Sequence, residues 1–84
     1  MKIYIDAGHG GDSIGATYKG RIEQNDTLRL SLAIRDLLIT QKNVEVKLSR
    51  TGNTNPSLTA RFNEANAWGA DYFLSIHRNA LSPN

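Results

Sequence analysis

The order of strand-like and helix-like segments constrains this chain of 84 residues more than any other feature of its sequence. Short runs of alternating, β-branched or aromatic side chains predict strands at residues 2–6, 44–48 and 72–76. Apolar side chains at helical spacing predict helices at residues 25–41 and 58–68. Strands that alternate with helices form parallel sheets through right-handed crossovers. We therefore expect one α/β domain with three layers, a parallel-type sheet and flanking helices.

Both predicted helices carry an apolar side that we expect to pack on the sheet. In the first helix this side consists of Leu30, Ala33, Ile34, Leu37 and Leu38, widened by Leu28, Leu32 and Ile39. The second helix has clearer ends, because Ser57 is a typical N-cap and Gly69 a typical C-cap. The core expected around the second helix consists of Leu58, Phe62, Ala65, Trp68, Tyr72 and Phe73.

Two helices are few for a sheet of three parallel strands, because parallel sheets normally have both faces covered. Open sheet edges also pair readily with other strands. We therefore expect residues 1–84 to be the N-terminal portion of a larger domain. We also expect the free edge of the sheet to favour self-association of the chain.

Composition excludes few classes of function. The 10 Lys and Arg residues against 8 Asp and Glu give a net charge of +2, which does not favour nucleic acid as a partner. The absence of cysteine excludes disulfides and thiolate metal sites. No apolar run approaches the ~20 residues of a membrane span, and no signal peptide is visible. We expect synthesis in the cytoplasm, export by another route, or release from a longer precursor.

The two histidines of the chain both follow predicted strands. His9 lies three residues after the first strand, and His77 directly follows the third. Ligands of open parallel sheets bind outside the carboxyl ends of the strands, which lie at one edge. Glu23 lies at the start of the first helix and reaches the same edge. Two histidines and one glutamate form a typical three-ligand zinc site, which leaves an open position for water and suits amide hydrolysis.

Each of these residues also has a structural interpretation. A histidine can be an ordinary packed side chain, and Glu23 can be a first-turn acid that complements the helix dipole, worth about 0.3–1 kcal/mol. The glycine-rich loop at residues 7–20 indicates backbone that turns or closely approaches another group. Its Gly8-His9-Gly10-Gly11-Asp12-Ser13 segment fits neither the dinucleotide fingerprint nor a P-loop. An anion-binding α/β domain with structural histidines is the corresponding alternative function.

Several polar residues near this edge are candidates for contacts with a metal ligand or a substrate. Arg50 follows the second strand and either contacts substrate or ties the loop. Asn79, two residues after His77, either orients a metal ligand or belongs to a turn. Asp6 and Asp12 are acids close enough in sequence to His9 to accept a hydrogen bond from its imidazole, although ordinary loop polarity also explains Asp12.

A series of short motifs, taken together, resembles the zinc-dependent N-acetylmuramoyl-L-alanine amidases of the amidase type 3 family. The motifs are, in order, Ile5-Asp6-Ala7-Gly8-His9-Gly10-Gly11, Gly15-Ala16, Glu23, Leu48-Ser49-Arg50-Thr51, Ser57-Leu58 with Arg61, Ala65-Asn66, Gly69-Ala70-Asp71, Ser75-Ile76-His77 and Asn79-Ala80. They cover essentially the whole chain, and their order and spacing are specific although each motif alone is not.

The resemblance implies that His9, Glu23 and His77 are the ligands of Zn²⁺. It implies hydrolysis of the amide bond between N-acetylmuramic acid and L-alanine in bacterial peptidoglycan. The chain departs from the family at Ser13, where an acid is usual, and this should not affect the ligands. Members of the family are about twice as long, with about six strands. The general acid/base glutamate of the family is expected downstream of Asn84, so no catalytic residue beyond the metal site is expected in this chain.

Two functions follow from the resemblance. The first is a cell-wall lytic enzyme, a phage endolysin or bacterial autolysin, that acts at the cell wall after secretion or after release on lysis. The alternative is a catalytically incomplete fragment that binds zinc and cell wall without turnover. Neither requires nucleic acid or a membrane as a partner.

Overall fold

The computed structural model describes residues 1–10, 15, 17–18 and 20–77 of the chain. Its elements are β1 (Lys2–Ala7), β2 (Thr17–Tyr18), β3 (Arg21–Ile22), α1 (Glu23–Leu38), β4 (Glu45–Leu48), α2 (Leu58–Trp68) and β5 (Tyr72–Ile76). Within the described residues, neither helix is long and apolar enough to cross a membrane.

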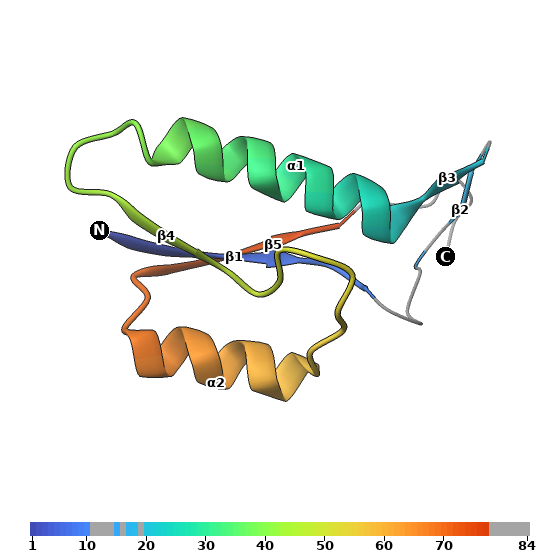
Figure 1. The fold of residues 1–84 in the computed structure, drawn as a ribbon. Helices are drawn as coiled ribbons and strands as arrows, with labels where there is room; N and C mark the ends of the chain where they lie inside the picture. Colours follow the sequence, from blue (N-terminus) through green and yellow to red (C-terminus); the bar gives the residue numbers. More distant parts are fainter. Residues whose placement is uncertain (11–14, 16, 19, 78–84) are drawn as a thin grey trace.

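The sheet has the strand order β4-β1-β5, and both pairs of neighbouring strands are parallel. Ile5 of the central strand β1 lies beside Leu48 on one side and Leu74 on the other. This central position buries Tyr4, Ile5 and Ala7 completely. Helix α1 covers one face of the sheet and α2 covers the other (Figure 1). The predicted three-layer α/β architecture with a parallel sheet is therefore confirmed.

A small antiparallel hairpin lies where the sequence predicted only loop. Strands β2 and β3 pair Thr17 with Ile22 and lie immediately before α1. The hairpin projects beyond the first turn of α1, away from the main sheet (Figure 1). Strands of two residues are too short to produce a recognisable alternation of apolar and polar side chains, so sequence periodicity does not reveal them.

Helix α1 buries only part of the apolar side predicted for it, since Ile34 and Leu38 are half-buried and its fully buried side chains are polar. It runs from Glu23 to Leu38 rather than over residues 25–41, and its buried residues are Glu23, Gln24, Thr27 and Ser31. Leu30 and Leu37 flank this buried side and are 51% and 71% exposed. The physical reason is that α1 packs against backbone at the ends of the strands, where polar groups are needed. The hydroxyl of Thr27 donates to the Gly8 carbonyl oxygen at 2.6 Å.

Helix α2 has the predicted ends but not the predicted buried side. The Ser57 hydroxyl accepts a hydrogen bond from the Ala60 amide at 3.0 Å, and Gly69 ends the helix in the left-handed conformation. Ala65 is buried as expected, but Leu58 and Phe62 are exposed, and Arg61 is buried instead. Arg61 takes this position because its guanidinium forms an ion pair with the buried Asp6 of β1.

The aromatic residues around β5 are less buried than the sequence predicted. Tyr72 is 60% exposed, and Phe73 is partly covered by stacking on Tyr4 with ring centroids 5.4 Å apart. Trp68 is half-buried beneath the ammonium group of Lys2. In the described part of the chain, β5 forms one edge of the sheet and has β1 as its only neighbouring strand. Within the described residues, the side chains of Tyr72, Phe73 and Leu74 are therefore only partly covered.

The N-cap of α2 offers a direct test of this fold. We expect Ser57→Ala to lower the free energy of unfolding by about 1 kcal/mol, because the Ala60 amide loses its acceptor. Thr59→Ala removes an exposed hydroxyl from the same helix and should change stability by less than about 0.5 kcal/mol. Urea denaturation followed by Trp68 fluorescence measures both variants. Equal stabilities of the two variants would contradict the assigned cap.

Candidate metal centre

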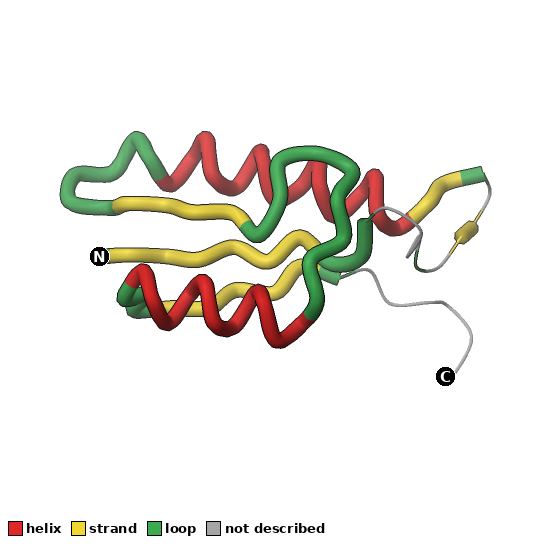
Figure 2. Tube along the Cα trace, turned by 60° about the horizontal axis from the view of Figure 1, so that its bottom comes forward, coloured by secondary structure: helices red, strands yellow, loops and turns green. Residues whose placement is uncertain are grey.

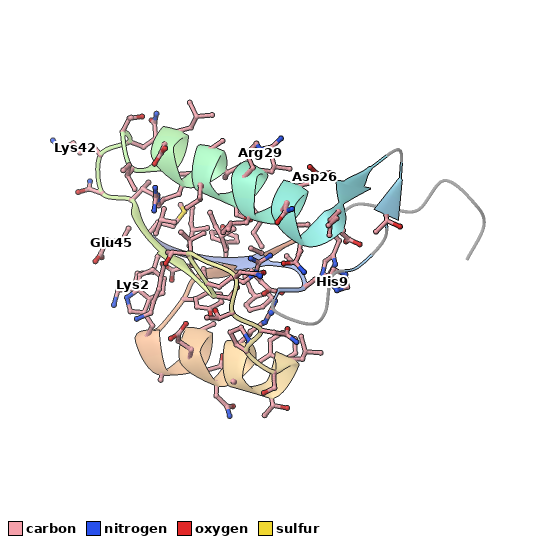
Figure 3. All side chains as sticks on the ribbon, turned by 45° about the vertical axis from the view of Figure 1, so that its right-hand side comes forward. Lys2, His9, Asp26, Arg29, Lys42 and Glu45 are labelled. Atoms are coloured by element: carbon pink, nitrogen blue, oxygen red, sulfur yellow. The ribbon has the colours of Figure 1, made fainter. Side chains whose placement is uncertain are left out.

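The three candidate ligands converge at the carboxyl ends of the parallel strands. His9 lies two residues after β1, His77 directly follows β5, and Glu23 is the first residue of α1. Figure 3 shows His9 at one end of the domain, with Lys2 and Glu45 at the opposite end. The convergence follows from topology, because parallel strands place their carboxyl ends at one edge.

The distances between the ligand atoms suit a single metal ion. Glu23 Oε1 lies 3.3 Å from His9 Nε2, and Glu23 Oε2 lies 3.4 Å from His77 Nδ1. One ligand atom from each of the three residues can be chosen so that all lie within 4.8 Å of one another. Zinc bonds of about 2.0–2.2 Å in tetrahedral geometry place neighbouring ligand atoms about 3.3–3.6 Å apart. The donor set suits Zn²⁺, and each imidazole lies at about this separation from one oxygen of Glu23.

The site is buried on one side and open on the other. The Glu23 side chain is 5% exposed, whereas those of His9 and His77 are 28% and 49% exposed. A buried carboxylate needs partners that compensate for the loss of water. The two imidazoles contact the Glu23 carboxylate from the solvent-exposed side of the site. Their rings are nearly perpendicular, with the centroids 5.3 Å apart. A ligand that reaches the histidines can therefore approach from solvent.

A cavity of about 170 Å³ adjoins the two histidines on this open side. Besides His9 and His77, its lining includes Asn55 and Pro56 from the connection between β4 and α2, and Leu58 at the start of α2. Figure 2 shows this connection arching past the carboxyl ends of the strands. A group bound in this cavity would lie directly beside the two candidate histidine ligands.

Two glycines of the loop make the close approach of the ligands possible. A Cβ atom on Gly8 would lie 2.7 Å from His77 Nδ1, and one on Gly15 would lie 2.6 Å from Glu23 Oε1. Gly15 also has a φ of +76°, which favours glycine. The glycine density of this loop indicated backbone that closely approaches another group, and the described glycines confirm it.

His9 itself has backbone in the left-handed region, with a φ of 65°. Non-glycine residues in this region are uncommon, and the conformation persists where surrounding contacts fix it. Arg61 Nη2 donates to the His9 carbonyl oxygen at 3.1 Å, and Arg50 Nη2 donates to that of Gly8 at 3.0 Å. The backbone that carries His9 is therefore fixed from two sides.

Arg50 lies in the interior and not on the cavity wall. Its guanidinium donates to the carbonyl oxygens of Ala7, Gly8, Gln24 and Gly52, and to the hydroxyl of Thr27. Burial lowers the pKa of Arg50 below the ordinary value for arginine, and the neighbouring Arg61 lowers it further. Of the two roles that the sequence left open for Arg50, these contacts fit tying the loop.

Asp6 contacts Arg61 and the Ser75 hydroxyl, which lies 3.0 Å from Asp6 Oδ2. Sequence reasoning placed Asp6 beside an imidazole and assigned Arg61 no role. A signal was present, because an acid inside an otherwise apolar strand needs a cation from a neighbouring element. Two further candidates, Asp12 and Asn79, lie outside the described residues.

Known proteins resemble this chain in sequence over nearly its whole length. The family model described as N-acetylmuramoyl-L-alanine amidase matches residues 3–84. N-acetylmuramoyl-L-alanine amidase CwlM of Bacillus licheniformis is 54% identical over 81 residues, which is 95% of this chain and 32% of that protein. The endolysin of Bacillus phage SPP1 is 37% identical over 78 residues, which is 93% of this chain and 29% of that protein.

Solved structures show the same similarity. The N-acetylmuramoyl-L-alanine amidase from Clostridium difficile 630 superposes with a TM-score of 0.92 at 36% identity, covering 99% of this chain and 46% of that one. The chain thus spans about half the length of this structure and about a third of the two relatives above. With the matched family model and the shared fold, the chain belongs to the N-acetylmuramoyl-L-alanine amidase family.

Proposed function

We propose that this chain is the zinc-binding, N-terminal portion of an amidase catalytic domain, with His9, Glu23 and His77 as the ligands. The observation that carries the proposal is the convergence of three ligand atoms from three separate elements. Its substrate is bacterial peptidoglycan, and the bond cleaved is the amide between N-acetylmuramic acid and L-alanine. The family and the names of the relatives support this substrate.

The three candidate ligands would have different roles at such a site. Zinc, when bound, would activate water and polarise the carbonyl of the amide. Glu23 supplies the negative charge that a dication needs, and its burial keeps this charge from being screened by water. His9 and His77 hold the exposed side of the site and border the cavity. The amide of the substrate can therefore reach the metal position without rearrangement of the sheet.

The similarity to a phage endolysin and to bacterial amidases supports action at the cell wall, after secretion or after release on lysis. We assign no general acid or base among the residues that the structure describes. An incomplete fragment that binds zinc and cell wall without turnover is the alternative. It differs from the enzyme in one measurable respect, the release of peptide from muramyl-peptide.

Zinc binding tests the ligand assignment. We expect near-stoichiometric zinc in protein purified without added metal. Glu23→Gln and His77→Ala should each weaken zinc affinity by more than about 100-fold, which exceeds the 10–100-fold typical of residues that only support a ligand. Glu45→Gln, an exposed carboxylate at the other end of the domain, is the matched control. Elemental analysis and competition titration give both quantities. Equal affinities of Glu23→Gln and Glu45→Gln would reject Glu23 as a ligand.

Turnover then separates the enzyme from the fragment that only binds. The enzyme should release L-alanyl peptide from muramyl-peptide, lose this activity with a chelator and regain it with zinc. Zinc binding and retention on cell wall without release of peptide would establish the alternative. Release of peptide that a chelator does not affect would reject both forms of the proposal.

Gly8 provides a second test of the site. Gly8→Ala should weaken zinc affinity at least about tenfold, because the added methyl group would push the His77 imidazole out of place. Gly52→Ala is the matched control, since a Cβ atom there meets nothing within 4 Å. Both variants are measured by competition titration with a zinc chelator. Unchanged affinity in Gly8→Ala would show that His77 does not need its observed position.

We also propose that the chain associates with itself through β5, whose residues Tyr72 and Leu74 are exposed at the sheet edge. Light scattering should show dimers whose fraction rises with concentration. Tyr72→Lys should shift the equilibrium to monomers, because charges on edge strands oppose pairing. Leu37→Lys makes the same apolar-to-cation change on α1 and should leave the dimers unchanged. A monodisperse monomer of the unmodified chain would contradict this proposal.

A further inference from the structure

Two buried arginines, one after β4 and one in α2, donate hydrogen bonds to three consecutive carbonyl groups at the end of β1. Arg50 Nε and Arg61 Nη1 both donate to the Ala7 carbonyl oxygen, at 3.1 and 3.0 Å. The next two carbonyls, those of Gly8 and His9, accept from Arg50 and Arg61 respectively. Together the two guanidinium groups fix the whole backbone segment that leads into the candidate ligand His9.

Placing two buried cations close together is electrostatically unfavourable, so their presence here needs an explanation. Arg50 and Arg61 are only 4% and 5% exposed, and the Asp6 carboxylate contacts Arg61, whereas Arg50 donates to carbonyl oxygens and to the Thr27 hydroxyl. Burying cations costs several kcal/mol each, and well-packed apolar side chains often replace buried ion pairs without loss of stability. The buried carbonyl groups at this place need donors, but that need does not by itself require two cationic side chains.

The contacts of the two arginines extend to the segments that carry the other two candidate ligands. Arg50 Nη2 donates to the Gln24 carbonyl oxygen at 2.9 Å, one residue after Glu23. Arg61 holds one oxygen of Asp6, whose other oxygen accepts from the Ser75 hydroxyl two residues before His77. Each of the three ligand-bearing segments is thus bonded to the same connected network.

We propose that Arg50 and Arg61 are positioning residues that hold His9, Glu23 and His77 in metal-binding geometry before the metal arrives. The inference rests on the proposed function, because it concerns the same site. Arginine suits this role, since its planar fork of five donors binds several carbonyls in fixed directions, whereas lysine presents a single ammonium group on a flexible stem. The left-handed backbone of His9 is a conformation that such a clamp can maintain.

The sign of the effect on metal affinity separates positioning from electrostatics. Two nearby positive charges repel a dication, so an electrostatic role alone predicts that neutralising either arginine tightens zinc binding. Positioning predicts the opposite, namely weaker binding in Arg50→Met and in Arg61→Met. It also predicts weaker binding in Arg50→Lys and Arg61→Lys, because the charge remains but the fork is lost.

The experiment measures zinc affinity by chelator competition and the visible absorption spectrum of the Co²⁺-substituted protein, with urea denaturation of each metal-free variant. We expect the lysine and methionine variants to lose about 10–100-fold in zinc affinity and to show an altered Co²⁺ spectrum. Arg29→Lys, on the exposed side of α1, is the matched control and should behave as the unmodified chain. The spectrum reports ligand geometry, which a purely structural role in folding would not change in a folded variant.

Ser75→Ala covers the case in which the arginine variants do not fold. It removes only the hydroxyl that links Asp6 to the His77 segment, so the fold should survive, and zinc affinity should fall several-fold with a shifted Co²⁺ spectrum. Unchanged affinity and spectrum in Ser75→Ala and in every folded arginine variant would overturn the positioning role while the unmodified chain still binds zinc. Failure of the unmodified chain to bind zinc would instead overturn the proposed function, and the positioning role with it.

Discussion

The buried ion pair between Asp6 and Arg61 is the interaction on which the site end of this domain depends. Asp6 lies in the central strand, where water cannot solvate its carboxylate, so a cation must come from a neighbouring layer. Helix α2 supplies Arg61, whose guanidinium also donates to the Ala7 and His9 carbonyl oxygens. The ion pair that compensates the Asp6 charge thereby holds α2 against the sheet. The same guanidinium also fixes the end of β1 and the backbone of His9.

The same logic explains why both helices turn polar residues toward the sheet near its carboxyl edge. The strands end there and their carbonyl groups need donors, because buried backbone groups are almost always hydrogen-bonded. Thr27 and Arg50 both donate to the Gly8 carbonyl oxygen. In the middle of β1, where strand pairing satisfies the backbone, Tyr4 and Ile5 form the apolar centre. The domain thus has an apolar centre that stabilises the layers and a polar carboxyl edge that shapes the candidate site.

Much of the fold could be predicted from local pattern. The alternation of Glu45 and Lys47 with Val46 and Leu48 indicated a strand with one exposed side, and the structure has that burial pattern. Ser57 and Gly69 marked the ends of α2 because capping depends on the residue itself and on its immediate neighbours. The candidate ligands His9 and His77 could be placed at one edge because strand direction alone determines where they lie.

The buried sides of the helices could not be predicted in this way. Periodicity selected Leu30 and Leu37 for the interior, yet they are exposed, while Thr27 and Ser31 are buried. Periodicity reports which residues share a side of a helix, but the partner across the interface decides which side is buried. For Thr27 the partner is backbone at a strand end, so a hydrogen-bonding side chain occupies a position that an apolar one would occupy over a continuous sheet. The Ser31 hydroxyl instead donates to the Thr27 carbonyl oxygen of its own helix.

The sequence by itself determined the class of fold, the direction of the strands and the three residues that meet at their ends, because these follow from periods and order along the chain. Only the tertiary structure decided that the meeting is close enough for a metal ion, with Glu23 at 3.3 and 3.4 Å from the two imidazoles. The tertiary structure alone also showed that Arg50 and Arg61 donate hydrogen bonds to the carbonyl oxygens of Gly8 and His9. The physical reason is that these hydrogen bonds join residues 42 and 52 positions apart in the chain, and the three ligands also come from separate parts of it, which no local pattern can relate.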